Sequence, residues 1–158
     1  MTKPTVYIET SVVSYLVARP SRDVIVLGHQ VITAEWWEKS LPRVDAFTSQ
    51  AVLVEAAKGD PDAARRRLSA LEGIPIVPES PTADNLARTY ISEKLIPQSV
   101  AYDALHLALA SVFEIEYLLT WNCRHLAAAN IRKAIWDINR REGFSTPELC
   151  TPEQLMEF

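Results

Sequence analysis

Four acidic or amide side chains stand beside apolar runs at widely separated places in the chain. They are Glu9, Glu55, Asp103 and Asn122. Carboxylate and amide oxygens are the ligands that Mg²⁺ and Mn²⁺ prefer, and a metal site that acts on phosphates needs only a few of them from the protein. If the fold brings these side chains together, they form a site for one or two divalent cations.

Asp103 is the most informative of the four because its sequence neighbours are apolar. Residues 99–109, SVAYDALHLAL, are typical of a helix with Ser99, Asp103 and His106 on one face. A carboxylate taken out of water without a partner costs several kcal/mol or becomes protonated. We therefore expect Asp103 to face a cation, a donor network or a solvated cleft, with an ion pair or a helix cap as the open alternative. His106 could orient Asp103 or contact a substrate, although the commoner role of such a residue is a core histidine with satisfied hydrogen bonds.

The length and composition indicate a single globular domain spanning residues 1–158. The chain is 48% hydrophobic and 23% charged, which argues against disorder. No run reaches the roughly 20 apolar residues of a membrane span, and the N-terminus lacks the pattern of a secretory signal. We expect a cytoplasmic protein without a membrane segment.

The charge and the cysteines exclude some other classes. A net charge of −4 does not resemble a basic nucleic-acid-binding module, although it permits a local basic patch such as residues 124–141. Residues 65–67, three arginines in a row, are most simply a solvated helix face. Cys123 and Cys150 are far apart and belong to no zinc-binding pattern, so we expect free thiols.

Apolar runs alternate with helical patterns along the whole chain. Strands are expected at 5–8, 44–48, 74–77 and 115–121, with a further edge strand near 149–150. Helices are expected between them: 10–16 with Thr10 or Ser11 as its cap, 23–40, 49–58, 61–72, 82–95, 99–109 and a basic helix or helix pair ending near 141. This alternation indicates an α/β fold with a mainly parallel central sheet of four to five strands covered on both faces.

The predicted fold gives two of the four side chains a direct claim to a site. In an open parallel sheet, ligands bind outside the carboxyl ends of the strands. Glu9 and Asn122 follow predicted strands directly. Glu55 lies in the helix after the second strand, and Asp103 lies in the first turns of the helix before the fourth, so four segments could point oxygen ligands into one crevice.

The ordered motifs resemble those of the PIN domain family, and in particular a VapC-like toxin of a type II toxin-antitoxin system. They are VYIETSVVSYL, SQAVLVEAAKGD, YDALHLALA and YLLTWNCRHLAAAN, and the resemblance covers nearly the whole chain. It implies a three-layer α/β/α sandwich, Mg²⁺- or Mn²⁺-dependent ribonuclease activity, a cognate antitoxin protein and a homodimer.

Carried over position by position, the resemblance makes Glu9, Glu55, Asp103 and Asn122 the catalytic and metal-binding residues. Two of them depart from the family pattern. Glu9 is one methylene longer than the usual aspartate, which moves the carboxylate. Asn122 brings an amide oxygen without charge where an acid is common, so the cluster holds at most three negative charges and should bind a second cation less tightly.

Other polar side chains near these positions are candidates for substrate binding. The hydroxyls of Thr10 and Ser11 stand at a helix N-terminus, where a phosphate or a metal-bound water could be met. Arg124 and His125 follow Asn122 and could hold RNA phosphates, with a surface salt bridge as the alternative for Arg124.

The sequence thus predicts a metal-dependent endoribonuclease that hydrolyses RNA phosphodiester bonds. The alternative is a catalytically weakened PIN-like module that binds RNA or a protein, motivated by the two departures at Glu9 and Asn122. A phosphorylatable receiver domain would share the acidic pocket, but the chain lacks a suitable lysine after a late strand.

Overall fold

The computed structural model describes residues 2–124, 126 and 128–156. His125, one of the predicted substrate-binding residues, lies outside this part. The strands of the described part are β1 (Thr5–Ile8), β2 (Asp45–Ser49), β3 (Ile76–Val77), β4 (Tyr117–Leu119) and β5 (Glu148–Cys150). The α-helices are α1 (Thr10–Val17), α2 (Val24–Lys39), α3 (Gln50–Ala56), α4 (Pro61–Leu71), α5 (Pro81–Ser92), α6 (Ala101–Val112) and α7 (Ala129–Glu142). Three short 3₁₀ helices complete the elements: η1 (Leu41–Arg43), η2 (Gln98–Val100) and η3 (Pro152–Leu155).

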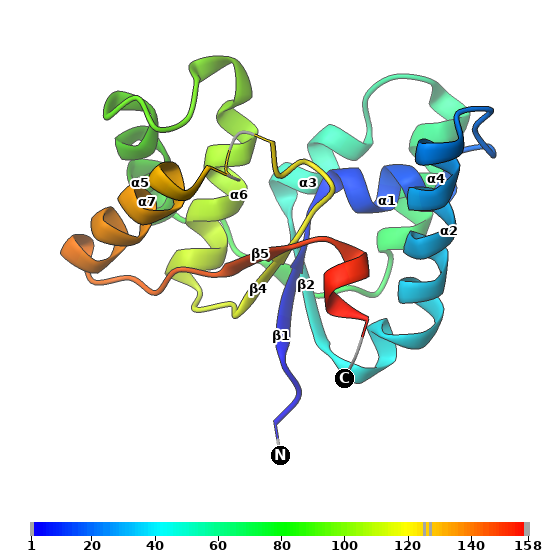
Figure 1. The fold of residues 1–158 in the computed structure, drawn as a ribbon, viewed down its shortest axis with the longest axis horizontal. Helices are drawn as coiled ribbons and strands as arrows, with labels where there is room; N and C mark the ends of the chain where they lie inside the picture. The colour runs from blue at the N-terminus through cyan, green and yellow to red at the C-terminus, as the bar shows by residue number, and fades with distance from the viewer. Residues whose placement is uncertain (1, 125, 127, 157–158) are drawn as a thin grey trace.

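The strands of the described part form one sheet in the order β3-β2-β1-β4-β5, and every neighbouring pair is parallel. Helices α1, α2 and α4 lie on one side of this sheet and α5, α6 and α7 on the other (Figure 1). The predicted three-layer α/β/α sandwich with a parallel sheet is therefore confirmed.

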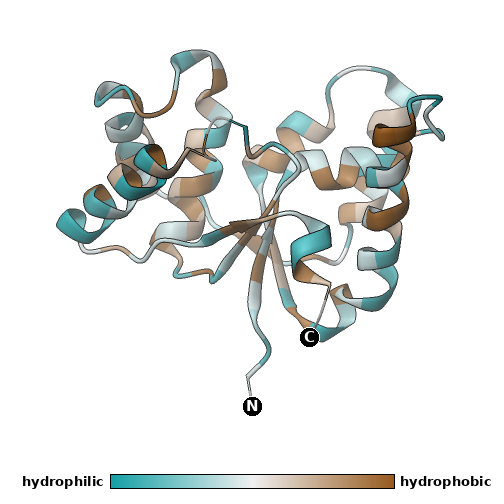
Figure 2. Ribbon diagram, viewed as in Figure 1, coloured by the Kyte–Doolittle hydropathy of each residue, from teal (hydrophilic) through white to brown (hydrophobic). Residues whose placement is uncertain are grey.

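Alternating side chains of the central strand β1 pack into two separate hydrophobic cores, one on each face of the sheet. Val6 and Ile8 pack with Trp36 of α2, whereas Tyr7 packs with Leu107 of α6. Because successive strand side chains point to opposite faces, a strand covered on both sides must be apolar throughout. Figure 2 shows this as a hydrophobic band along the central strands.

The predicted strands at 74–77 and 115–121 are longer than those in the structure. Ile115 is buried, at 3% exposure, but lies in the turn between α6 and β4. The apolar run is thus longer than the strand, because it includes a buried residue that does not pair in the sheet.

The predicted cap of the first helix is wrong, whereas three other helices begin with side-chain caps close to their predicted starts. Asp23 caps α2, Ser49 caps α3, and Asp60 caps α4 ahead of Pro61. The cap of α1 is Glu9, not Thr10 or Ser11, because the Glu9 carboxylate accepts the backbone N–H of Ser11. The strand-end carboxylate therefore also begins the helix.

Ser99 does not share a helix face with Asp103 as predicted. It lies in η2, the 3₁₀ turn before α6, and is exposed. The α-helix α6 begins only at Ala101, directly after this turn. Among the described residues, no helix combines the length and apolar character needed to cross a membrane.

The two cysteines are free thiols, as predicted, and differ in exposure. Cys150 is buried at 5% exposure, and burial raises its pKa to about 12 from an ordinary 9.0. Cys123 is half-buried; burial first, and then the negative charge of Glu9, raise its pKa as well.

A thiol-specific reagent at pH 8 should therefore modify Cys123 long before Cys150. The thiolate is the reacting form, and Cys150 is both more deeply buried and raised in pKa to about 12, so its thiolate is scarce and poorly accessible. Mass spectrometry after timed alkylation, with Cys123→Ser and Cys150→Ser variants assigning each rate, tests this expectation. Equal rates for the two thiols in native protein would contradict it, whereas equal rates in denaturant are expected.

Candidate metal centre

The predicted polar residues gather where the direction of strand order reverses. From β1 the chain builds the sheet outward through β2 and β3 on one side and through β4 and β5 on the other. The crevice outside the carboxyl ends of β1 and β4 is the usual ligand site of such a sheet. Glu9 directly follows β1, and Thr120 and Asn122 follow β4.

Glu9 is held rigidly at this point by hydrogen bonds to one of its carboxylate oxygens. Oε2 accepts from the backbone N–H of Ser11 at 3.0 Å, from the Ser11 hydroxyl, and from Thr120 Oγ1 at 2.7 Å. The side chain is only 6% exposed. Among the described residues, no hydrogen bond reaches Oε1, so this oxygen remains available to a cation.

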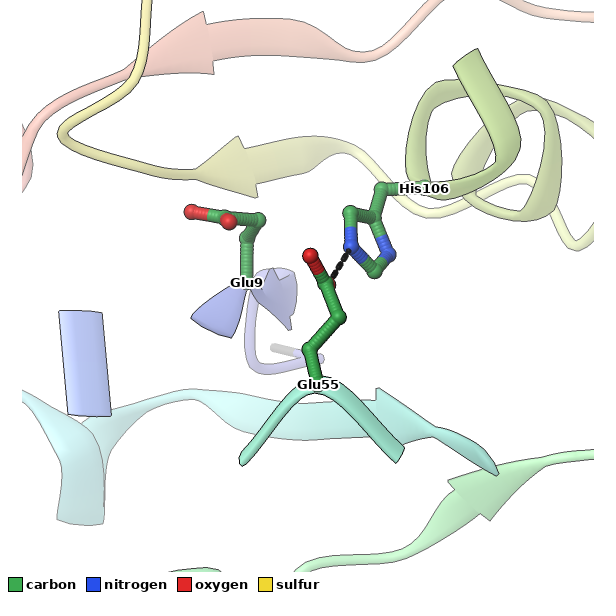
Figure 3. A group of neighbouring side chains, drawn as sticks. All are labelled: Glu9, Glu55 and His106. Atoms are coloured by element: carbon green, nitrogen blue, oxygen red, sulfur yellow. Dashed lines mark hydrogen bonds and ion pairs between the residues drawn. The ribbon is translucent and has the colours of Figure 1, made fainter. Parts of the chain in front are cut away.

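Glu55 projects from α3 and is fixed by a buried histidine on the opposite side of the crevice (Figure 3). His106 Nε2 lies 2.5 Å from Glu55 Oε1, which also accepts the Thr10 hydroxyl at 2.7 Å. The other ring nitrogen of His106, Nδ1, lies 2.7 Å from the Tyr7 hydroxyl, and Ser49 Oγ lies 2.6 Å from that same hydroxyl. A continuous chain of hydrogen bonds thus leads from Ser49 to Thr10.

The protons of this chain balance in one arrangement. His106 Nε2–H donates to Glu55, the Tyr7 hydroxyl donates to Nδ1, and the Ser49 hydroxyl donates to Tyr7. Ser49 Oγ then accepts the backbone N–H of Val52 at 3.2 Å. Each polar atom has a partner, and the chain points one histidine N–H at Glu55. The predicted core histidine with satisfied hydrogen bonds is therefore confirmed, but it orients Glu55 and not Asp103.

The chain also sets the charge of its members. Burial raises the pKa of Glu55, but the interaction with His106, the hydrogen bond from Thr10 and the positive charge of Lys58 outweigh burial and leave this pKa below its ordinary value. Burial raises the pKa of Tyr7 far above its ordinary value, and the negative charges of Glu9 and Glu55 add to this effect. Glu55 is therefore ionised at neutral pH, and Tyr7 stays a neutral donor.

Asp103 and Asn122 lie beside Glu9 at a second part of the crevice. Asn122 Nδ2 donates to Asp103 Oδ2 at 3.0 Å, and the Asn122 backbone N–H donates to Thr120 Oγ1 at 2.8 Å. Asp103, Asn122, Glu9 and His106 line one narrow pocket of about 10 Å³, close to the space one water needs. Asp103 is half-buried and faces a donor and this pocket, as its apolar sequence context predicts.

The donor set fits a hard divalent cation. The ligand atoms of Glu9, Glu55 and His106 all lie within 4.8 Å of one another. Because His106 Nε2 carries the proton that it donates to Glu55, the two carboxylates are the ligands of this group and His106 supports one of them. Asn122 presents its amide nitrogen, not its oxygen, to Asp103, which lies outside this group and lines a pocket with Glu9.

The predicted substrate-binding residues have different positions. The hydroxyls of Thr10 and Ser11 are hydrogen-bonded to Glu55 and Glu9, so in this structure they position the carboxylates. Arg124 is exposed on the segment after β4. That segment is anchored through Trp121, whose ring stacks on His29 with centroids 4.1 Å apart.

Sequence reasoning missed Tyr7, Ser49 and Thr120 as members of the site. A tyrosine within an otherwise aliphatic strand, and a threonine directly after a buried strand, were signals that could have found two of them. Comparison with protein-family models and with curated proteins finds no match for this chain.

Proposed function

We propose that the protein is a metal-dependent endoribonuclease of the PIN type, the toxin of a toxin-antitoxin pair. The observation that carries the proposal is the position of Glu9 at the carboxyl ends of β1 and β4, where it lies close to Glu55 and His106 and lines one pocket with Asp103. A soluble fold gains no stability from crowding like charges, so such a cluster suits a cation.

The three carboxylates would hold Mg²⁺ or Mn²⁺. Such an ion, when bound, lowers the pKa of a bound water and offsets the charge that develops on a phosphodiester during in-line attack. Ser11 and Thr120 keep Glu9 in place, and His106 and Thr10 do the same for Glu55. The hydrogen bonds to these four residues thus hold both carboxylates in place before a cation binds.

Cleavage of a mixed cellular RNA pool tests this function. The purified protein is incubated with Mn²⁺, with Mg²⁺ or with EDTA, and the products are separated by length. Discrete products are expected with metal and none with EDTA. Products that persist in EDTA, or that appear equally with an Asp103→Asn variant, would refute the assignment because they would come from a contaminant or from another chemistry.

The alternative, a catalytically weakened PIN-like binding module, is favoured by one specific feature. Asn122 is neutral and uses its amide nitrogen on Asp103, so the site has one charge fewer than a cluster of four acids. Thermal unfolding with increasing Mn²⁺ separates the two functions. A nuclease site should raise the melting temperature as the metal saturates, because ligands that bind only the folded state stabilise it. A binding module should show neither this rise nor cleavage.

The proposal extends to partners and location. Three apolar side chains on α2 are unusually exposed, namely Val24 at 81%, Ile25 at 71% and Val31 at 58%. Such a patch supports association with another protein. A second copy of the chain and a cognate antitoxin are the partners we propose, in the cytoplasm, where RNA is the substrate.

A further inference from the structure

Helix α6 presents two adjacent faces to two different pockets. Asp103 and His106 line the narrow pocket of the carboxylate site. Tyr102, Leu105 and Leu109, spaced three and four residues apart, line a second pocket of about 300 Å³ on the neighbouring face. The two pockets therefore share helix α6 as a wall.

The second pocket also connects to the candidate metal centre through α3. Its wall includes Ser49, the residue that begins the hydrogen-bond chain through Tyr7 and His106 to Glu55. Gln50, Ala51 and Val54 of α3 also line this pocket, so α3 contributes Glu55 to one site and part of the wall to the other. A polymer whose backbone crosses the carboxylates would bring its adjoining group to this pocket.

The walls of the pocket are mainly apolar, with a few polar groups. Val54, Val77 and Leu105 supply aliphatic surface, and Tyr102 supplies an aromatic ring. A volume of about 300 Å³ with such walls is typical of small-ligand pockets, whereas the narrow pocket has room for little more than an ion or a water. The larger pocket is therefore suited to a ring.

The polar groups of the pocket are acceptors that repel anions. Two of them are exposed acids: Glu79 lies in the loop before α5, and Asp84 lies in the first turn of α5. Gln50 adds an amide. These carboxylates disfavour a phosphate but accept hydrogen bonds from amino groups, as they do from the amino group of cytosine. Bases of single-stranded RNA are recognised by such edges together with stacking on aromatic side chains.

Lys58 is close to a wall residue of the second pocket and acts electrostatically on Glu55, and it carries the positive charge that a backbone phosphate needs. Its Nζ is 4.8 Å from the centroid of the Tyr102 ring, and its charge contributes to the lowered pKa of Glu55. A phosphate beside Lys58 would have the carboxylate site on one side and the ring-sized pocket on the other.

We infer that this pocket is a nucleobase subsite that holds one amino-bearing base of single-stranded RNA against Tyr102, with Glu79 and Asp84 as acceptors for its amino group. The inference rests on the proposed ribonuclease function, because that function places the RNA backbone at the carboxylates. It makes Glu79 and Asp84 specificity-determining residues, since adenine, cytosine and guanine carry an exocyclic amino group and uracil does not.

Binding of the four nucleoside monophosphates in EDTA tests the inference without metal or cleavage. Amide shifts of isotopically labelled protein are followed by NMR during titration with AMP, CMP, GMP and UMP. The expected result is shifts at Tyr102, Val54 and Leu105, with at least one amino-bearing nucleotide binding about 3- to 10-fold more tightly than UMP. No shift at these residues with any nucleotide would overturn the inference.

A double variant, Glu79→Gln with Asp84→Asn, should lower the preference for the amino-bearing nucleotide over UMP by at least about 2-fold, because amide oxygens are weaker acceptors than carboxylates. The matched control is Glu93→Gln with Asp137→Asn, which makes the same charge change outside the pocket. Glu93 follows the last residue of α5, Asp137 lies on α7, and both are exposed. An unchanged preference in the first variant would overturn the inference. A parallel titration with an arginine-rich peptide checks the other ligand that an acidic pocket could take. Amide shifts at the pocket with this peptide and with none of the nucleotides would also overturn the inference.

The two proposals can fail separately. Nucleotide binding at Tyr102 without any metal-dependent cleavage of RNA would support the subsite and refute the proposed nuclease function. Cleavage that needs metal but shows no base preference, together with an absence of amide shifts at the pocket residues, would support the nuclease function and refute the subsite.

Discussion

Asp103→Asn is expected to lower metal-dependent RNA cleavage by about 100-fold or more, while the free energy of unfolding changes by less than about 1 kcal/mol. The substitution keeps the shape of the side chain and leaves an oxygen that can accept from Asn122, so the contact at 3.0 Å can persist. It removes one of three negative charges at the crevice, and metal-assisted catalysis depends on the ion being held there.

Three measurements define this result: the initial rate of cleavage of one RNA substrate, the Mn²⁺ concentration at half-maximal rate, and the midpoint of urea unfolding. Asp137→Asn is the matched control because it makes the same chemical change at an exposed position on α7, where Asp137 pairs with Lys133. The control should keep its rate within about 2-fold, since surface substitutions of this kind have small effects. A folded Asp103→Asn variant with full activity would exclude Asp103 from the catalytic site.

The fold was predictable because both of its sequence signals are local. A strand buried on two faces must be largely apolar, as over residues 6–8, and a helix needs a cap, as at Asp23 and Asp60. The ends of strands were less predictable because burial and pairing are different properties. Ile115 is as buried as a strand residue but lies in a turn.

The candidate site was predictable for residues that directly follow strands. It was not predictable for side chains whose hydrogen-bond partners are distant in the chain. Glu9 and Asn122 follow β1 and β4, and topology alone brings them to one edge. The partners of His106 are 51 and 99 residues away in the chain, at Glu55 and Tyr7. A sequence pattern pairs His106 with Asp103, three residues before it, because local spacing is all it can read.

The same limit explains the roles of Thr10 and Ser11. Their position at a helix N-terminus suggests capping or phosphate binding, and both are local arguments. In the structure, the Thr10 hydroxyl crosses to Glu55 on α3, and the Ser11 hydroxyl returns to Glu9. Two carboxylates brought close together need neutral donors, and these hydroxyls supply them.

His106→Ala is expected to lower the free energy of unfolding by about 2–5 kcal/mol, because it combines two separate losses. The side chain is 1% exposed, so its removal leaves a cavity in the core. It also leaves the Tyr7 hydroxyl and the Glu55 carboxylate without their imidazole partner. Urea unfolding monitored by circular dichroism measures the loss. A change below about 0.5 kcal/mol would mean that the chain of hydrogen bonds does not stabilise the fold.

Conservative variants separate the cavity from the hydrogen bonds. His106→Gln keeps an amide N–H that can reach Glu55, whereas Tyr7→Phe keeps the ring and removes only the hydroxyl between Ser49 and His106. In a double-mutant cycle, Tyr7→Phe and His106→Ala should be coupled by about 0.5–3 kcal/mol because they share one hydrogen bond. Additive effects of the two substitutions would show that this bond contributes nothing of its own.

The pKa of Glu55 gives a readout that a purely structural role of His106 would leave unchanged. In the native protein, the interaction with His106 lowers this pKa and burial raises it. Removal of the imidazole takes away the influence of His106 and leaves only those of Thr10 and Lys58 to lower this pKa, so the pKa of Glu55 should rise in His106→Ala and recover in part in His106→Gln. Carbon NMR of the side-chain carboxyl during an acid titration follows this directly. If the pKa of Glu55 were the same in all three proteins, His106 would fill space in the core without holding Glu55 in its ionised form.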